Sequence, residues 1–421
     1  MNPPKAFAAI RLALAMSVLL TACAVNTLAS STEKILHNFG AAGDGANPSA
    51  GMTFDAQGNL YGTTAGGGTG DCVPGPCGII FQLTPNQNGT WTENLVHTFQ
   101  GLDGGFDPNP VILDRRGNLY GASPCAHQDC FVFPNVGGVV FQITPGPNGS
   151  WDFRLIQIFS NVSQQGYYPS GLAFDPAGHL YGTTSGGGPA ADGVAFLLGQ
   201  VSVSGWYEIV AHYFTGGSGD GSGPTGALAF DNSGNVYGVT TDGGAHNNGT
   251  VYKLTPNHDS FGWSETVLYE FTGGNDGKFP NGVVLDAAGN LYGTTEEGGA
   301  GGLGTVFELT PNQNGTWTEN VLHSFAGGSD GAAPQYAPTL DAVGDLYGTA
   351  LRGGSGSAGI VYELTPSGGQ WQENIVYSFT GGADGGSPYC GVVLDNSGNI
   401  YGTTYSGGAY DNGGVAFEIT P

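Results

Sequence analysis

Basic residues are scarce in this chain of 421 residues. Lysine and arginine together number nine, against 34 aspartates and glutamates, and the formal charge is −25. Proteins that bind nucleic acids or anionic membrane surfaces use basic patches to replace counterions. This composition therefore argues against nucleic acid and anionic bilayer surfaces as partners. It leaves cations, cationic groups and neutral polymers.

A membrane-spanning segment is also missing from the amino terminus. Lys5 and Arg11 precede an apolar stretch at residues 12–20, which is far shorter than the roughly 20 residues of a transmembrane helix. The sequence Leu-Thr-Ala-Cys at residues 20–23 resembles a bacterial lipobox. We therefore predict a lipoprotein-type signal peptide at residues 1–22, a lipid on Cys23 and a tether at residues 23–31. The alternative is ordinary cleavage near Ala29 and a secreted product.

Either outcome places the protein outside the cytoplasm, and we expect it in the bacterial cell envelope.

Only six cysteines are present, and four of them form two closely spaced pairs: Cys72 with Cys77, and Cys125 with Cys130. An oxidising compartment favours disulfides over zinc. We expect the two local bridges, while a bridge between the pairs and a zinc site remain alternatives. Cys390 lies in an apolar strand and is predicted to be a buried free thiol.

Helical periodicity is absent after the amino terminus, and a repeat takes its place. The phrase D-x-x-G-N-L-Y-G-T-T, or a close variant, occurs seven times at intervals of 54–61 residues between its tyrosines. Each unit contains four runs rich in Val, Thr, Tyr, Phe and Trp, separated by Gly, Pro, Asn and Asp, which is typical of strands and turns. In one unit these runs, named A to D, lie at residues 282–286, 290–295, 304–310 and 317–325. The repeated tyrosines are Tyr61, Tyr120, Tyr181, Tyr237, Tyr292, Tyr347 and Tyr401.

Two features recur in every unit and predict structure rather than chemistry. An aspartate opens each A–B turn and a glycine follows three residues later, as in a type I turn that ends in a left-handed glycine. Aromatic rings recur in strands B and C and at the end of strand D, and burying one of them contributes roughly 1.5–3 kcal/mol. We therefore predict that the aspartates are turn residues and that the rings form the core.

The two ends of the chain complement each other. Six units have a strand D that begins with tryptophan, but the last unit stops at Pro421 without one. Residues 32–39 align with residues 92–99, which form a strand D, so the missing strand lies at the amino terminus. The sequence therefore predicts an all-β fold: one seven-bladed β-propeller of four-stranded blades at residues 32–421. The strand at 32–39 completes the blade of residues 388–421, and we expect a monomer.

The loops between strands D and A carry a recurring G-G-x-D-G. These loops lead into the innermost strands, so their carboxylates could form a broken ring near the channel mouth and attract Ca²⁺, which takes several oxygen ligands. The alternative is that each aspartate caps its own glycine turn and faces water. No other cofactor is expected. The candidate ligands are Asp44, Asp103, Asp220, Asp276, Asp330 and Asp384.

No catalytic motif stands out. Four histidines share one position on strand D of separate units and cannot meet at one metal, and no nucleophile–base arrangement is present. The acids that break the repeat pattern of the B–C loops are Glu296 and Glu297, which makes them the catalytic candidates. Binding residues concentrate on variable loops, so we place a functional site on the face of the D–A and B–C loops.

The phrase G-N-L-Y-G-T-T-x-x-G-G followed by G-T-V-F-x-L-T-P, seen whole at residues 289–311, resembles the GloVer tandem repeat of "choice-of-anchor" bacterial surface proteins. The resemblance covers essentially the whole mature chain. It implies an exported repeat protein with its own anchor, here Cys23, and it supplies no catalytic residues.

Three functions remain open at this level. The first is a lipid-anchored, non-catalytic propeller that binds a glycan or a peptide and meets the membrane only through its lipid. The second is a polysaccharide or lactone hydrolase or lyase with its site in the channel. The third is a structural spacer of the envelope. Function lives in the site, so the fold does not choose among them.

Overall fold

The computed structural model describes residues 31–70, 77–100, 108–124, 136–160, 164–202, 205–257, 262–410 and 412–421. These residues belong to one compact unit, Ser31–Pro421. They contain β-strands and a single 3₁₀ turn, η2 (Pro147–Gly149), and no α-helix. Accordingly, no helix in this described part is long and apolar enough to span a bilayer.

The strands pair in successive antiparallel sets of four, each ordered along the sequence from its first strand to its last. In the first half of the chain the sets are β3 (Thr53–Phe54), β4 (Leu60–Thr63), β6 (Ile79–Pro85) and β7 (Trp91–Thr98); β8 (Ile112–Leu113), β9 (Leu119–Ser123), β10 (Val136–Pro145) and β11 (Trp151–Ser160); and β12 (Tyr167–Phe174), β13 (Leu180–Gly186), β14 (Val194–Ser202) and β15 (Gly205–Tyr213).

The next sets are β16 (Gly221–Phe230), β17 (Val236–Gly243), β18 (Thr250–Asn257) and β19 (Gly262–Glu270); β20 (Lys278–Leu285), β21 (Leu291–Glu297), β22 (Thr305–Pro311) and β23 (Trp317–Ser324); and β25 (Thr339–Leu340), β26 (Leu346–Ala350), β28 (Ile360–Ser367) and β29 (Gln370–Ser378). A parallel bridge between Ala227 and Gly282 joins β16 to β20. Short pairs form between β2 (Gly45–Ala46) and β5 (Gly66–Gly67), and between β24 (Gly331–Ala332) and β27 (Arg352–Gly353).

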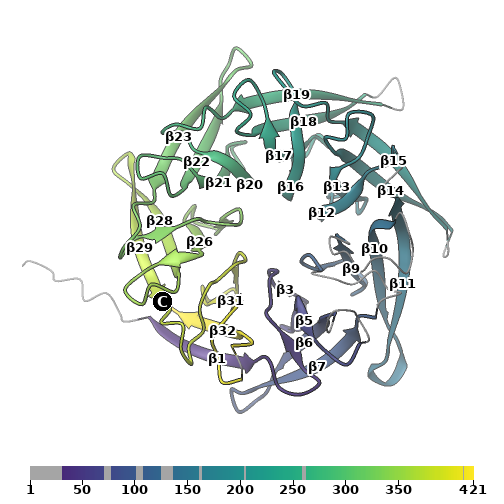
Figure 1. Ribbon diagram of the computed structural model, residues 1–421, viewed down its shortest axis with the longest axis vertical. Coiled ribbons are helices and arrows are strands. Elements are labelled where there is room, and N and C mark those ends of the chain that lie inside the picture. The colour runs from purple at the N-terminus through teal and green to yellow at the C-terminus, as the bar shows by residue number, and fades with distance from the viewer. Residues whose placement is uncertain are drawn as a thin grey trace, which may run out of the picture. The chain divides into compact units, whose positions relative to one another are not determined.

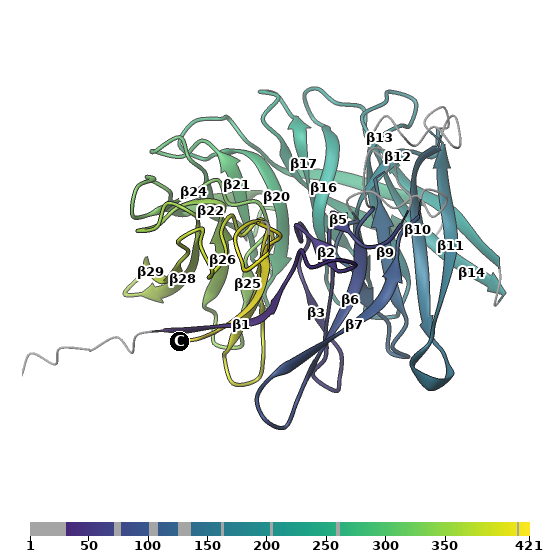
Figure 2. The ribbon, with the colours of Figure 1, turned by 60° about the horizontal axis from the view of Figure 1, so that its bottom comes forward.

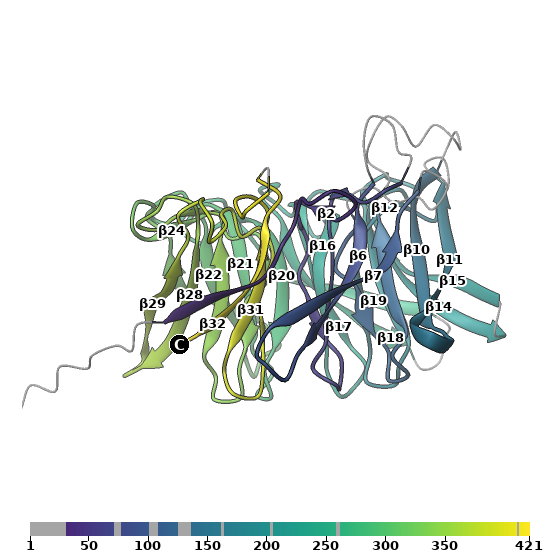
Figure 3. The same ribbon diagram turned by 90° about the horizontal axis from the view of Figure 1, so that it is seen from below.

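The last set combines the two ends of the compact unit. Strands β30 (Val393–Leu394), β31 (Ile400–Thr404) and β32 (Val415–Thr420) are followed in the sheet by β1 (Thr32–Asn38). β1 pairs with β32 in antiparallel register from Thr32↔Thr420 to Asn38↔Val415. Figures 1 and 3 both show β1 beside β32, and in Figure 2 the purple β1 lies next to the carboxy terminus marked C. The sequence predicted this pairing from the missing final strand.

The strand sets are arranged radially around a common centre in Figure 1. Strands such as β12, β16 and β20 lie nearest the centre, whereas β7, β11, β15, β19 and β23 lie at the periphery. Hydrogen bonds near the centre join neighbouring sets. Asn109 Nδ2 donates to the Pro169 carbonyl at 2.9 Å, and Ser170 Oγ donates to the Pro224 carbonyl at 2.9 Å.

The core lies between neighbouring sets, and the predicted aromatic residues fill it. One cluster, for example, joins Tyr237 of one set to Leu291 and Phe307 of the next. The rings at the ends of the outer strands and those of strand C are fully buried, as predicted. They are Phe39, Phe99, Phe159, Phe214, Phe271, Phe325 and Phe379, with Phe81, Phe141, Phe196, Tyr252, Phe307, Tyr362 and Phe417.

This packing explains the glycine after the repeated tyrosine. A Cβ atom on Gly293 would lie 2.4 Å from Cζ of Phe307, far inside van der Waals contact. The neighbouring strand C thus places its ring directly over the glycine. Glycine is required here for space rather than for backbone freedom.

The aspartate of the A–B turn is a turn residue, as predicted. Oδ1 of Asp55 accepts hydrogen bonds from the backbone N–H groups of Gln57 and Asn59, both at 2.9 Å. Its Oδ2 accepts from Asn59 Nδ2 at 2.7 Å and from the Tyr61 hydroxyl at 3.1 Å. Burial, with the nearby charge of Asp55, raises the pKa of Tyr61 to about 12. The repeated phrase therefore encodes a turn that is tied to the core.

Candidate functional site

The aspartates of the G-G-x-D-G loops bind their own turns. The Asp220 carboxylate accepts hydrogen bonds from the Thr215 N–H at 2.8 Å, the Thr215 hydroxyl at 2.6 Å and the Gly221 N–H at 2.7 Å. Asp44, Asp276, Asp330 and Asp384 make comparable bonds, whereas Asp103 lies outside the described residues. The capping alternative is thus confirmed for these five. The expectation that they face water is wrong for Asp276, which is only 9% exposed.

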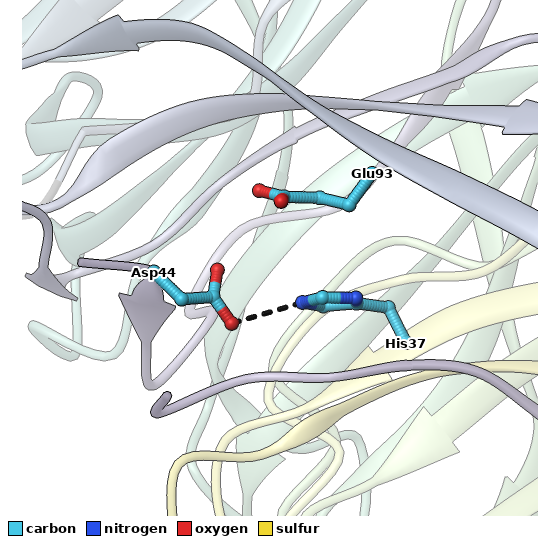
Figure 4. Close-up of side chains that lie close together, drawn as sticks. All are labelled: His37, Asp44 and Glu93. Carbon is cyan, nitrogen blue, oxygen red and sulfur yellow. Dashed lines mark hydrogen bonds and ion pairs between the residues drawn. The ribbon is translucent and has the colours of Figure 1, made fainter. Parts of the chain in front are cut away.

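Each of these aspartates also meets the outer strand of its own set. His37 Nε2 lies 2.9 Å from Oδ2 of Asp44, and Figure 4 shows the two side chains pointing toward one another with Glu93 beside them. Glu93 comes from β7, the outer strand of the neighbouring set. The sequence placed four histidines on separate outer strands but did not reveal that three of them, His37, His212 and His323, each face an aspartate and a glutamate.

The same contact recurs around the ring. Three groups hold potential ligand atoms within 4.8 Å of one another: His37, Asp44 and Glu93; His212, Asp220 and Glu265; and His323, Asp330 and Glu373. At two further boundaries a tyrosine replaces the histidine. Tyr269 donates its hydroxyl to Asp276 at 3.1 Å, and Tyr377 donates to Asp384 at 3.4 Å. At these five boundaries the position is thus a histidine or a tyrosine, and either side chain contacts the loop aspartate.

Each of the three groups found among the described residues contains one histidine, one loop aspartate and one glutamate. None of the three contains a second loop aspartate. One imidazole and two carboxylates are ligands that divalent cations accept. The calcium ring at the channel mouth stays a prediction.

The glutamate of this contact is the most perturbed acid of the repeat. Burial raises the pKa of Glu33, Glu208, Glu265, Glu319 and Glu373 to about 7. In each of these five, Oε1 is buried and has no hydrogen-bond partner. The loss of water around a carboxylate favours its protonated form. Glu208 is raised by burial although its Oε2 accepts from Gln157 Nε2 at 2.7 Å. The sequence signal was a glutamate two residues after the tryptophan of strand D, with which Glu33 of the first strand aligns.

The catalytic candidates lie at the end of β21. Glu297 is exposed, and its Oε2 lies 2.7 Å from Lys278 Nζ. Glu296 is partly buried, and neither residue belongs to the three groups described above or lines the central cavity. A surface ion pair of this kind contributes little to stability. Their catalytic role stays a prediction.

One of the cysteine predictions is confirmed, and the others concern residues outside the described part of the chain. Cys390 is a free thiol, 1% exposed, as predicted. Cys77 is fully buried, but Cys72, Cys125 and Cys130 lie outside the described residues, as does Cys23. The two local disulfides and the lipid therefore stay predictions.

A central cavity of about 550 Å³ lies where the innermost strands of all the sets meet. Its wall is mainly apolar and includes Met52, Val111, Leu172, Val284, Leu340 and Val392. Among the described residues, Tyr336 is the one member of this wall with a titratable side chain. The wall can therefore enclose apolar groups.

Radial sets of four antiparallel strands around such a centre define a propeller-like, all-β repeat protein. The model of the Gloeobacter/Verrucomicrobia repeat matches residues 23–202, 129–341 and 314–421. Its overlapping matches extend from Cys23 to the final residue. The chain belongs to this family of tandem-repeat proteins.

Solved structures show similarity at the level of the fold. Two structures of the extracellular domain of a B. thetaiotaomicron protein match, one described as a proposed one component system and the other as a proposed hybrid two component system. They are both 15% identical, with TM-scores of 0.53 and 0.57 over 91% and 93% of this chain. This chain covers only 41% and 42% of theirs.

A gluconolactonase of Xanthomonas campestris is 15% identical over 72% of this chain and 82% of its own, with a TM-score of 0.40, which is too low to support an argument. None of the curated proteins matches.

Proposed function

We propose that the chain is an exported scaffold, anchored through a lipid on Cys23, that binds a glycan or a peptide at the cell envelope. Its strand sets form a closed propeller of seven blades, of which β1 completes the last. Two features support this count: each repeated tyrosine belongs to its own set of four strands, and β1 pairs with β32 at the ends of the compact unit.

The residues that line the central cavity favour binding over hydrolysis. Glycoside hydrolysis requires two carboxyl groups roughly 5–10 Å apart on either side of the scissile bond. In the part of the chain that the structure describes, the cavity wall holds no carboxyl group, and Tyr336 is its one titratable residue. This mainly apolar wall supports the binding of a ligand better than its hydrolysis.

The propeller also provides what a binding scaffold needs. The rings at every boundary are fully buried, and the turns are saturated with hydrogen bonds. Loops held by such a rigid frame can vary without loss of the fold. The envelope-spacer alternative uses the same frame but requires no ligand.

The test uses the soluble chain beginning at Ala24, which contains the whole compact unit. Panels of polysaccharides and peptides, with and without Ca²⁺, are screened by thermal shift, and the same polysaccharides are assayed for released reducing ends. We expect at least one ligand to raise the melting temperature without release of product. Release that disappears in a Glu296→Gln, Glu297→Gln variant would support the hydrolase alternative. No shift and no release would support the spacer.

A further inference from the structure

A cleft of about 990 Å³ lies between the second and third strand sets. Its walls come from the β8–β9 turn with β10 and β11, and from the β12–β13 turn with β14 and β15. It therefore opens at the end of the blades that carries the A–B turns, opposite the loops in which sequence variation suggested a site.

The cleft concentrates positive charge in an acidic protein. Seven of the nine basic residues follow Arg11, and three of these seven, Arg115, Arg116 and Arg154, line this cleft. Arg115 Nη2 donates to the Pro176 carbonyl across the boundary at 2.9 Å, which fixes its guanidinium at the wall. His179 adds an imidazole to the same wall.

The wall also holds two acids, Asp114 and Asp152, against its three arginines. The Asp114 carboxylate accepts from the Arg116 and Asn118 N–H groups at 2.8 and 2.9 Å. Its Oδ2 accepts from Asn118 Nδ2 at 2.7 Å and from the Tyr120 hydroxyl at 3.3 Å. Both oxygens of Asp114 thus accept hydrogen bonds from its own turn and from Tyr120. Asp152 is the second acid of the wall.

Several residues that line the cleft are ones in which these two sets depart from the repeat. Arg115 and Arg116 occupy the turn positions of Ala287 and Ala288 in the fifth set, and Arg154 occupies that of Asn320. His179 replaces the turn asparagine of Asn290, and its Nδ1 lies 2.8 Å from Oδ2 of Asp175. The fifth set forms the same four strands with alanine and asparagine at these positions, so the repeat itself does not require arginine there.

The third set also departs from the repeat at Gly199, which takes the position of Thr310 in the fifth set and lines the cleft. A Cβ on Gly199 would lie 2.3 Å from Cζ of Tyr207, its partner on β15. Trp206 lines the cleft, and because side chains alternate along a strand, the Tyr207 ring lies on the other face of the set.

We propose that this cleft binds an anionic saccharide, with the arginines on its carboxylate or sulfate group and the polar side chains of the wall against its hydroxyl groups. This inference rests on the proposed function as a ligand-binding scaffold and names its site and ligand class. Guanidinium groups match planar and multidentate oxyanions closely. Salt screens the overall negative charge beyond about 8 Å at physiological ionic strength, so the local cluster governs contact.

The polar residues of the wall favour a saccharide over an acidic peptide. Gln142, Gln200 and Thr144 can donate to and accept from hydroxyl groups, and Asp152 can accept from them. A sugar presents several hydroxyls for each charge. A run of acidic side chains presents one carboxylate after another, which Asp114 and Asp152 would repel.

The experiment measures binding by calorimetry with the soluble chain beginning at Ala24. The probes are tetragalacturonate, a sulfated galactan tetrasaccharide, neutral maltotetraose and tetraglutamate. The cleft variant is Arg115→Ala, Arg116→Ala, Arg154→Asn, which installs residues that the fifth set already carries. The matched control is Arg352→Ala, which removes an exposed arginine outside the cleft.

We expect at least one anionic tetrasaccharide to bind, and the cleft variant to weaken it at least tenfold while Arg352→Ala changes it less than twofold. The carboxylated and sulfated probes distinguish the two anionic groups. Equal affinity in the cleft variant, equal binding of maltotetraose or tetraglutamate, or no binding of either anionic probe overturns the inference. A ligand from the broader screen that binds the cleft variant normally leaves the proposed function intact, whereas no ligand at all counts against both.

Discussion

Thr32 and Thr420 are 388 positions apart in the sequence, and they are direct partners in the antiparallel pair of β1 and β32. Lys34 reinforces this pair through its ammonium group, which lies 2.9 Å from Oε2 of Glu418. The outer edge of the last sheet is therefore covered by the beginning of the compact unit. An uncovered edge would expose unpaired backbone groups.

Deletion of residues 32–39 should lower the melting temperature sharply. The deletion removes the side chains of Leu36 and Phe39, which are 8% and 0% exposed. Each contributes roughly 1.5–3 kcal/mol, and the β32 edge also loses its hydrogen-bond partners. Differential scanning calorimetry of this variant and of one lacking residues 24–30 measures the effect. If both truncations melt like the parent chain, β1 does not close the last set.

Gly293→Ala should destabilise the protein by about 1–3 kcal/mol, the usual cost of overpacking a rigid core. The new methyl group would meet the Phe307 ring, whose Cζ lies 2.4 Å from the Cβ position. Gly274→Ala is the matched control, because its closest contact is 3.4 Å, to Thr272 Oγ1. Urea unfolding of both variants gives the two free energies. Equal midpoints for the two would contradict the steric explanation.

Asp286→Ala should cost about 2–4 kcal/mol, since several donors lose a charged acceptor at once. Oδ1 of Asp286 accepts from the Ala288 and Asn290 N–H groups, both at 2.8 Å, and Oδ2 accepts from Asn290 Nδ2 at 2.9 Å. Asp286→Asn keeps one acceptor oxygen and should cost less. Thermal unfolding of the two variants orders them, and a ranking in which Asn is worse than Ala would oppose the turn explanation.

The sequence predicted those parts of the structure that follow from local repetition. The turn at Asp55 and the buried ring of Phe81 could be read from one unit, because spacing and residue type determine both. The missing final strand predicted the partner of β32. These features depend on hydrogen bonding and burial that recur in each unit.

The contacts between units were harder to predict. Glu265 lies on β19 and meets His212 and Asp220 of the preceding set, a relationship that depends on the angle between neighbouring sets. The cleft lined by Arg115, Arg154 and Gly199 likewise draws its walls from two sets. A single unit contains no information about the angle at which the next one packs. The sequence placed a functional site on the face of the D–A and B–C loops, whereas the cleft opens at the A–B turns.

Stability should fall as the pH rises from about 5 to 8. Burial raises the pKa of Glu265, Glu319 and Glu373 from 4.5 to about 7 in the folded chain. Below pH 4.5 these groups are protonated in both states, so they contribute no pH dependence. Between pH 4.5 and 7 only the unfolded chain loses these protons, so folding becomes less favourable with rising pH. Above pH 7 both states are ionised and the loss is complete.

The triple variant Glu265→Gln, Glu319→Gln, Glu373→Gln should therefore flatten the dependence of the melting temperature on pH and melt higher than the parent at pH 8. The amide keeps the shape of the protonated acid but cannot ionise. Glu297→Gln is the control, because the Glu297 side chain is 49% exposed. Differential scanning fluorimetry between pH 5 and 8 measures the slopes. A triple variant with the parent's slope would show that these glutamates are ionised and solvated in the folded chain, and the boundary contact would then be held by the aspartates with their histidine and tyrosine partners alone.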